Sequence, residues 1–156
     1  MKIVLLFAAL MFALALPTAA LAVGSDTQPV ATPRDPDYDA GRNAIEAMNW
    51  RLALEHLNRA LARDAANADI HNYLGYAHRK SGNLDAAVRS YNEALRLDPR
   101  HKGAHEYIGE AYLMGNNLAK AEEHLAQLDK ICFFSCEEYR DLKKAVEEYR
   151  QRQARR

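Results

Sequence analysis

The sequence repeats itself every 34 residues from about Arg34 onward, and this period constrains the fold more than any other feature. Five register positions carry the same kind of residue in each of three units. These positions are Ala40-Gly41, Leu74-Gly75 and Ile108-Gly109; Trp50, Leu84 and Leu118; Ala53, Ala87 and Ala121; Leu57, Tyr91 and Leu125; and Ala60, Ala94 and Leu128. A fixed period of this length is typical of a solenoid, whose units bury their apolar faces by stacking on one another. We therefore expect three units, at residues 34–67, 68–101 and 102–135.

Each unit contains two helical patterns separated by a turn. In the second unit, residues at helical intervals form one apolar face of the first helix; these are Ile70, Tyr73, Leu74 and Ala77. The segment Ser81-Gly82-Asn83 ends this helix and begins the next, because glycine is favoured just after a helix and asparagine at an N-cap. Gly115-Asn116-Asn117 has the same role in the third unit, and Asn49 alone has it in the first. The predicted fold is all-α.

A glycine recurs at one position of the first helix in every unit, as Gly41, Gly75 and Gly109. The second helix carries small residues at a facing position, namely Ala53, Ala87 and Ala121. A larger side chain at either place would push two closely packed helices apart. We therefore expect each glycine to lie close to the second helix of its own unit.

The second unit also contains a longer motif, which consists of Leu74-Gly75, Gly82, Leu84, Ala87, Tyr91, Ala94 and Pro99. This motif resembles the tetratricopeptide repeat, which has Leu-Gly early in the unit, alanine and an aromatic residue in the second helix, and proline at the end. The resemblance covers residues 34 to about 153, and the first unit departs from the pattern at Ala40 and Ala65. It implies a solenoid of helical hairpins that binds other proteins.

A single amphipathic helix follows the third unit, at residues 136–153. Its apolar stripe consists of Tyr139, Leu142, Val146 and Tyr149. Since the glycine position of the repeat falls on Lys143 here, we expect no second helix to pack against it. We interpret it as the capping helix that a solenoid needs to cover its last apolar face. Ser135 followed by Glu138 indicates a capping box at its start, and a basic tail at residues 154–156 ends the chain.

The N-terminus has the features of a secretory signal peptide. An uncharged apolar stretch runs from Ile3 to Leu16 and is followed by the small-residue site Ala20-Leu21-Ala22. We expect cleavage after Ala22, which makes residues 1–22 the signal peptide and residues 23–33 a flexible linker. Because the apolar stretch is short for a membrane span of about 20 residues, we expect no stable membrane anchor after cleavage. The protein is predicted to be exported, either to the periplasm or outside the cell.

The only two cysteines, Cys132 and Cys136, lie at the boundary between the third unit and the capping helix. Export places them in an oxidising compartment, so our first interpretation is a structural disulfide across the inter-helix turn. It would fix the angle of the capping helix, with Phe133 and Phe134 as a partly buried plug. Two alternatives stay open: a reactive thiol pair, with Cys136 activated at a helix N-terminus, and a soft-metal site for an ion such as Cu(I).

The remaining residues offer no constellation for catalysis, for a cofactor or for nucleic acid. The formal net charge is zero, whereas nucleic-acid binding requires a clustered basic surface. No Ser-His-Asp arrangement, glycine-rich phosphate loop or zinc motif is present in the sequence. A metal site is one interpretation of His71, His78 and His105, but we expect them to replace large aromatic residues of the repeat, since no carboxylate or cysteine completes a cluster. We therefore expect neither enzymatic activity nor a cofactor nor a bound metal.

The resemblance implies a concave groove lined by the first helix of each unit. At the positions that the family uses, the groove residues here are Tyr38, Arg42, Asn72, Tyr76, Arg79, Lys80, Glu106 and Glu110. Tyr38 and Arg42 stand where a two-carboxylate clamp for extreme C-termini has lysine and asparagine, so we do not expect that clamp. Tyrosine and arginine are favoured binding anchors, and they suit a protein or peptide partner with apolar and acidic groups. The alternatives are a thiol-redox or metal-handling accessory protein that uses Cys132 and Cys136, and a structural assembly subunit.

Overall fold

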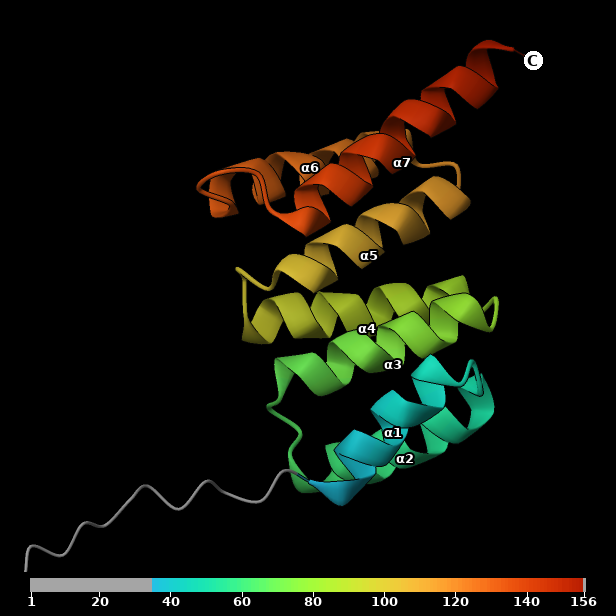
Figure 1. Cartoon of the computed structure of the whole chain (residues 1–156), viewed down its shortest axis with the longest axis vertical. Helices are drawn as coiled ribbons and strands as arrows, with labels where there is room; N and C mark the ends of the chain where they lie inside the picture. Colours follow the sequence, from blue (N-terminus) through green and yellow to red (C-terminus); the bar gives the residue numbers. More distant parts are fainter. Residues whose placement is uncertain (1–34, 156) are drawn as a thin grey trace, which may run out of the picture. The chain divides into compact units, whose positions relative to one another are not determined.

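The structure, a computed structural model, describes residues 35–155. The expected signal peptide, the linker and the last residue of the basic tail lie outside the described residues. Within this range the chain forms seven α-helices and no strand. They are α1 (Pro36–Glu46), α2 (Trp50–Arg63), α3 (Ala68–Lys80), α4 (Leu84–Leu97), α5 (Lys102–Met114), α6 (Leu118–Ile131) and α7 (Glu137–Ala154) (Figure 1). None of these helices is both long and apolar enough to cross a membrane.

The helices pack as three successive pairs, α1 with α2, α3 with α4 and α5 with α6, and each pair stacks on the next (Figure 1). α7 packs against both α5 and α6, in the place that the first helix of a further unit would take. The largest fully buried side chains come from the successive units and from α7: Leu57, Ile70, Tyr91, Ile108, Leu128, Leu142 and Val146. The expected all-α solenoid of helical hairpins with a C-terminal capping helix is confirmed.

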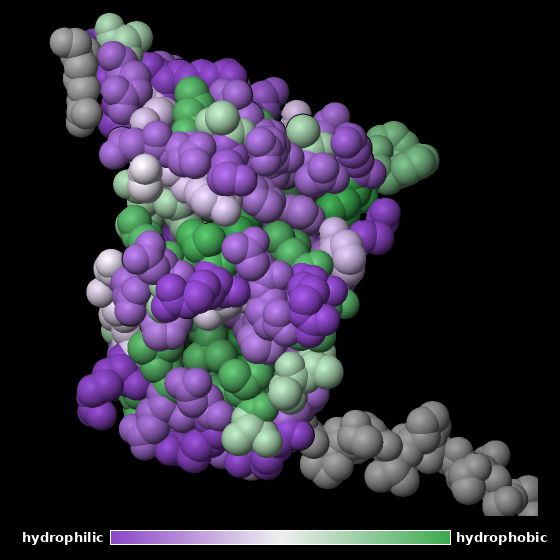
Figure 2. Space-filling model, turned by 180° about the vertical axis from the view of Figure 1, so that it is seen from behind, coloured by the Kyte–Doolittle hydropathy of each residue, from purple (hydrophilic) through white to green (hydrophobic). Residues whose placement is uncertain are grey.

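The first helices of the units lie closer to one another than the second helices do. α3 contacts α1 and α5, and α5 contacts α7, whereas no contact joins α2 to α4 or α4 to α6 in the described range. The row formed by α1, α3, α5 and α7 is therefore the inner, concave side of the solenoid. Figure 1 views this side, and Figure 2 shows the opposite face, where polar residues surround smaller apolar areas.

The turn inside each unit is built in the same way three times. An asparagine side chain accepts a hydrogen bond of 3.2 Å from the backbone N–H three residues further on, at Asn49, Asn83 and Asn117. The residue before each of these N-caps has a positive φ: Met48 (53°), Gly82 (83°) and Asn116 (58°). In the third unit this residue is Asn116, which stands 34 residues after Gly82. In the first it is a methionine, whose Cβ disfavours the left-handed conformation.

Two of the three repeated glycines lie against the second helix of their own unit, as expected. A Cβ atom on Gly41 would lie 2.7 Å from a side chain of α2, and one on Gly75 would lie 2.5 Å from Tyr91 of α4. At Gly109 the nearest side chain belongs instead to α7, since such a Cβ would lie 2.6 Å from Leu142. The capping helix has taken over this contact, because its apolar stripe covers the exposed end of the third unit.

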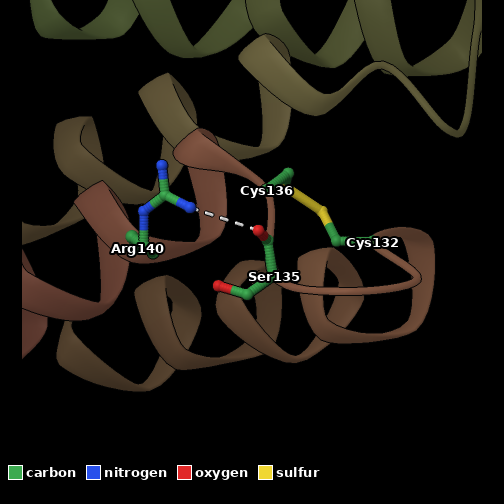
Figure 3. Close-up of a disulfide and its surroundings, with 4 residues drawn as sticks. All are labelled: Cys132, Ser135, Cys136 and Arg140. Carbon is green, nitrogen blue, oxygen red and sulfur yellow. Dashed lines mark hydrogen bonds between the residues drawn. A yellow bond between two sulfur atoms is a disulfide. The ribbon is translucent and has the colours of Figure 1, made fainter.

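The start of α7, just after the α6–α7 turn, differs from the expectation. α7 begins at Glu137, one residue later than expected, and its N-cap is Cys136, whose side chain makes no capping hydrogen bond. The capping box predicted at Ser135 is therefore wrong. Ser135 has a φ of 52°, and its carbonyl oxygen accepts a hydrogen bond of 3.2 Å from Nη1 of Arg140 (Figure 3).

Phe133 and Phe134 are not the expected buried plug. They are 91% and 87% exposed, respectively. Cys132 belongs instead to the apolar cluster formed by α5, α6 and α7, and Cys136 packs against that cluster. Because the cysteine side chains fill the inner side of this short turn, the two phenyl rings between them point outward.

Candidate peptide-binding groove

The eight residues predicted to line the groove all lie on α1, α3 and α5, the first helices of the units. Their exposure differs: Asn72, Arg79 and Glu106 are buried, Tyr38, Arg42, Tyr76 and Glu110 are half-buried, and Lys80 is exposed. The predicted residues of α3 and α5 other than Tyr76 border two pockets that also include residues of α7. Tyr38 and Arg42 lie apart from both pockets, on α1.

Arg79 lies at the centre of an aromatic cluster in the groove. Its guanidinium carbon lies 5.2 Å from the ring centroid of Tyr76 and 5.5 Å from that of Tyr107, distances at which a ring attracts a cation. The centroids of these two rings are 5.1 Å apart. Nη1 of Arg79 also forms an ion pair of 2.5 Å with Oε2 of Glu110. Since three neighbours hold it, the Arg79 side chain is fixed in one position and only 7% exposed.

Tyr73 and Tyr107 belong to this surface, although sequence reasoning missed them. Each ring lies against an arginine of the preceding unit: the Tyr73 centroid is 5.7 Å from the guanidinium carbon of Arg42, and the Tyr107 centroid is 5.5 Å from that of Arg79. The two tyrosines are 34 residues apart. The repeat period itself is thus the signal that could have identified them.

The first pocket, here called the basic pocket, has a volume of about 350 Å³ and lies between the C-terminal parts of α3, α5 and α7. Its lining residues are Arg79, Lys80, Glu110, Leu113, Met114, Ala145, Glu148 and Arg152. Three cationic side chains stand beside apolar ones here, and two of them, Arg79 and Arg152, are paired with the carboxylates of Glu110 and Glu148. This combination suits an acidic group next to an apolar one, which is the ligand chemistry expected from the sequence.

The second pocket, here called the acidic pocket, also has a volume of about 350 Å³ and lies between the N-terminal parts of α3, α5 and α7. Its lining residues are Asp69, Asn72, Tyr73, His101, Gly103, Glu106, Tyr107, Glu137, Glu138 and Asp141. Burial raises the pKa of Glu106 to about 8, and the neighbouring carboxylates of Glu110, Asp141 and Glu138 add to this effect. At neutral pH the Glu106 carboxyl group therefore carries its proton in the free protein.

Two histidines at equivalent register positions hold the helices to the turns that precede them. Nε2 of His71 lies 3.0 Å from the carbonyl oxygen of Ala65, and Nε2 of His105 lies 3.1 Å from that of Pro99. Nδ1 of His105 also lies 3.0 Å from Nδ1 of His124, and burial lowers the pKa of both rings. No group of three or more potential metal ligands occurs among the described residues. These contacts support a packing role for the histidines.

The two cysteines face each other across the α6–α7 turn, as expected (Figure 3). Their Sγ atoms lie at bonding distance, and their Cα atoms are 5.5 Å apart, within the range of about 4.4–6.8 Å that is usual for disulfides. The pair joins the end of one helix to the start of the next, and it lines neither pocket.

Comparison with known proteins identifies the fold. The family model of the tetratricopeptide repeat matches residues 38–99 and 75–132. Among solved structures, the type III secretion translocator chaperone SycD of Yersinia enterocolitica has a TM-score of 0.68 at 17% identity, over 76% of this chain and 83% of that chain. The TPR2B domain of yeast Sti1, in a complex with pHsp70, has a TM-score of 0.69 at 17% identity, over 74% and 94%. The second TPR domain of human RPAP3 has a TM-score of 0.63 at 21% identity, over 70% and 91%.

No curated protein matches the chain by sequence. At identities this low the solved structures show the fold alone, whereas the two segments matched by the family model together span more than half of the chain. The repeat period, the stacked helix pairs and the glycine contacts agree with that match. The chain belongs to the tetratricopeptide repeat family.

Proposed function

We propose that this chain is an exported protein–protein interaction module that binds a peptide or protein partner in its concave groove, and that it is not an enzyme. The observation that carries the proposal is the placement of Arg79, which is held between two tyrosine rings and a carboxylate. A cation that is already fixed loses little conformational freedom on binding, so it is suited to act as an anchor. The basic pocket beside it would take an acidic group of the partner together with an adjacent apolar side chain.

The solved structures of similar fold support this proposal. SycD has been solved in complex with a peptide of the translocator YopD, and the second TPR domain of RPAP3 in complex with an HSP70 peptide. We extend peptide binding, but not the identity of the peptide, from those proteins to this one. Tyr38 and Arg42 replace the lysine and asparagine of a two-carboxylate clamp, so the partner here is expected to be recognised by other groups.

The test is a comparison of partner capture by a groove variant and by a matched control. Lys80→Glu reverses an exposed charge in the basic pocket, and Lys130→Glu reverses an exposed charge on α6, outside both pockets. We expect the unmodified protein and Lys130→Glu to capture the same partner from the native exported fraction. Lys80→Glu should bind that partner about tenfold more weakly, because a like charge then faces the acidic group. Equal capture by all three proteins would contradict the proposal.

We also propose that residues 1–22 direct export and that Cys132 and Cys136 form a structural disulfide that holds α7 on α6. The bonding distance between the sulfur atoms supports the disulfide. Protein isolated from the exported fraction should begin at Val23, and a thiol titration should find free thiols only after reduction. Two free thiols that bind Cu(I) tightly in the native protein would favour the metal-handling alternative. A mass that rises with concentration in light scattering would favour the assembly-subunit alternative.

A further inference from the structure

We propose that the acidic pocket binds the cationic side chain of a lysine or arginine in the partner peptide. This inference rests on the proposed function and makes it more specific. The basic pocket accounts for an acidic group in the partner, and the acidic pocket adds a requirement for a basic residue. Two buried polar side chains without partners, the charges around them and the size of the pocket point to this ligand.

Asn72 lines this pocket and carries a buried hydrogen-bond acceptor that no described residue satisfies. The residue is 5% exposed, and its Oδ1 atom is buried without a hydrogen-bond partner in the described part of the chain. Buried carbonyl oxygens almost always accept a hydrogen bond, and an unmade bond of this kind costs free energy. An ammonium or guanidinium group brings several N–H donors and no acceptor, so it is the kind of group that would satisfy Oδ1.

Glu106 is the second polar group of the pocket without a partner. It is 8% exposed, and its carboxyl group forms no hydrogen bond or ion pair with another described residue. The charged and titratable groups that face it are Arg79 of α3, Tyr107 and Glu110 of α5, and Glu138 and Asp141 of α7, while Asp69, His101 and Glu137 line the same pocket. Arg79 is already paired with Glu110. Its charge therefore offsets only part of the effect that burial and the neighbouring carboxylates have on Glu106.

The lining of the acidic pocket is strongly one-sided in charge. It contains five carboxyl groups, one histidine, and neither lysine nor arginine. The raised pKa of Glu106, about 8, has a related cause, because burial and the nearby carboxylates disfavour its ionised form and Arg79 offsets them only in part. A cationic ligand would reverse this balance and would release the proton of Glu106 when it binds.

A side chain fits this pocket better than a metal ion does. A hard divalent cation needs six or more oxygen ligands at close range, and no cluster of three potential ligands exists in the part of the chain that the structure describes. A volume of about 350 Å³ is also far larger than a single ion requires. Lysine and arginine bury their aliphatic stems on apolar surface and keep the charged head at polar groups. The rings of Tyr73 and Tyr107 supply such a surface here.

The two pockets lie on opposite sides of the same groove. The acidic pocket is at the N-terminal parts of α3, α5 and α7, and the basic pocket is at their C-terminal parts. A bound peptide therefore meets mainly carboxyl groups on one side and an excess of cationic side chains on the other. The partner segment should carry both a basic and an acidic residue.

The pocket can be tested with small probes that carry one cation each. We would titrate the ¹⁵N-labelled protein with Nα-acetyl-lysine amide and with Nα-acetyl-arginine amide, and follow the backbone amide signals. Nα-acetyl-norleucine amide is the uncharged control, and MgCl₂ tests for a metal ion. We expect at least one cationic probe to shift the signals around Asn72, Glu106 and Asp141, while the norleucine probe and Mg²⁺ do not. The affinity should rise by up to about tenfold from pH 6 to pH 8.5, because ionised Glu106 pairs with the cation more strongly than protonated Glu106 does.

Three variants connect these signals to the pocket. Glu106→Gln keeps the shape of the side chain, and we expect it to weaken probe binding about tenfold and to remove most of the pH dependence. Asp141→Asn changes an exposed residue of the pocket, and it should weaken binding about threefold. Glu123→Gln, at an exposed position of α6 outside both pockets, should change nothing.

The outcomes distinguish this inference from the proposed function. The inference is overturned if neither cationic probe shifts these signals, if the norleucine probe or Mg²⁺ shifts them equally, or if Asp141→Asn binds as tightly as the unmodified protein. The second measurement is how strongly each variant binds the captured partner. Partner binding that is lost in Lys80→Glu but unchanged in Glu106→Gln and Asp141→Asn would leave the proposed function standing without this pocket. If all three variants bind the partner as the unmodified protein does, the proposed function is contradicted as well.

Discussion

Replacing Glu106 with glutamine should abolish a loss of stability that the protein undergoes as the pH rises from about 5 to about 8. The Glu106 carboxyl has its pKa raised from 4.5 to about 8, first by burial and then by the carboxylates of Glu110 and Asp141. In the unfolded chain the same group ionises near 4.5. Between these two values the folded state binds more protons than the unfolded state, so the free energy of unfolding falls as the pH rises. Glutamine cannot ionise, so this loss is absent in the variant.

The size of the effect follows from the pKa difference and from the exposure of the pocket. Each pKa unit corresponds to about 1.4 kcal/mol, so a change from 4.5 to about 8 sets an upper bound of about 5 kcal/mol. The pocket is open to solvent on one side, and water entering it screens the charges and stabilises the carboxylate. We therefore expect about 2 kcal/mol, less than half of the upper bound.

Urea unfolding followed by circular dichroism, at four pH values between about 5 and 8, measures this difference. We expect Glu106→Gln to match the unmodified protein at the lowest pH and to exceed it by about 2 kcal/mol at the highest. The exposed control Glu123→Gln should follow the unmodified protein throughout. His105 and His124 have lowered pKa values and act in the opposite direction below about pH 6.5, but all three proteins share them. Parallel stability curves for Glu106→Gln and the unmodified protein would refute the reasoning.

Three further predictions test the packing. Met48→Gly should raise the free energy of unfolding in urea by about 1 kcal/mol, because a φ of 53° suits glycine and the methionine side chain is 72% exposed; a loss of stability would show that the side chain matters more than the backbone. Gly75→Ala should lower the free energy of unfolding by about 2 kcal/mol or more, since its Cβ would lie 2.5 Å from Tyr91. The control Gly115→Ala has no atom of another helix near its Cβ, and it should change this free energy by less than about 0.5 kcal/mol. Changing both Cys132 and Cys136 to serine should lower the free energy of unfolding by about 1–3 kcal/mol, and with it the midpoint of thermal unfolding. Partner capture should stay intact. An unchanged midpoint would contradict a structural disulfide.

The fold could be predicted because its determinants are local and recur at one period. The N-cap at Asn83 and the close contact at Gly75 each depend on residues within one unit, so the sequence of that unit is sufficient to identify them. The contact of Gly109 with Leu142 could not be identified in this way. It depends on how a helix outside the repeat register settles on the last unit, and the register does not determine that. The outward-facing rings of Phe133 and Phe134 have a similar origin, since the cysteines beside them compete for the same inner surface.

The candidate site could be predicted only in part, for a related reason. Register positions identified Arg79 and Glu106 but not the pockets around them, because each pocket has one wall on α7. Glu137 and Glu138 also have an ordinary explanation in the sequence: acidic residues in the first turn of a helix are stabilised by the helix dipole. Only their position opposite Asn72 and Glu106 indicates a second role.

The capping helix therefore serves two purposes that lie on different faces of it. Its buried face, with Leu142 and Val146, closes the apolar core. Its groove face places Asp141 in the acidic pocket and Arg152 in the basic pocket, at opposite ends of the same helix. Adjacent residues such as Asp141 and Leu142 lie in the acidic pocket and in the apolar core, respectively. Substitutions on the groove face can therefore change ligand recognition, while the buried face continues to cover the core. A helix outside the repeat register does not have to keep the residues that the repeat pattern requires, so it can carry such charges.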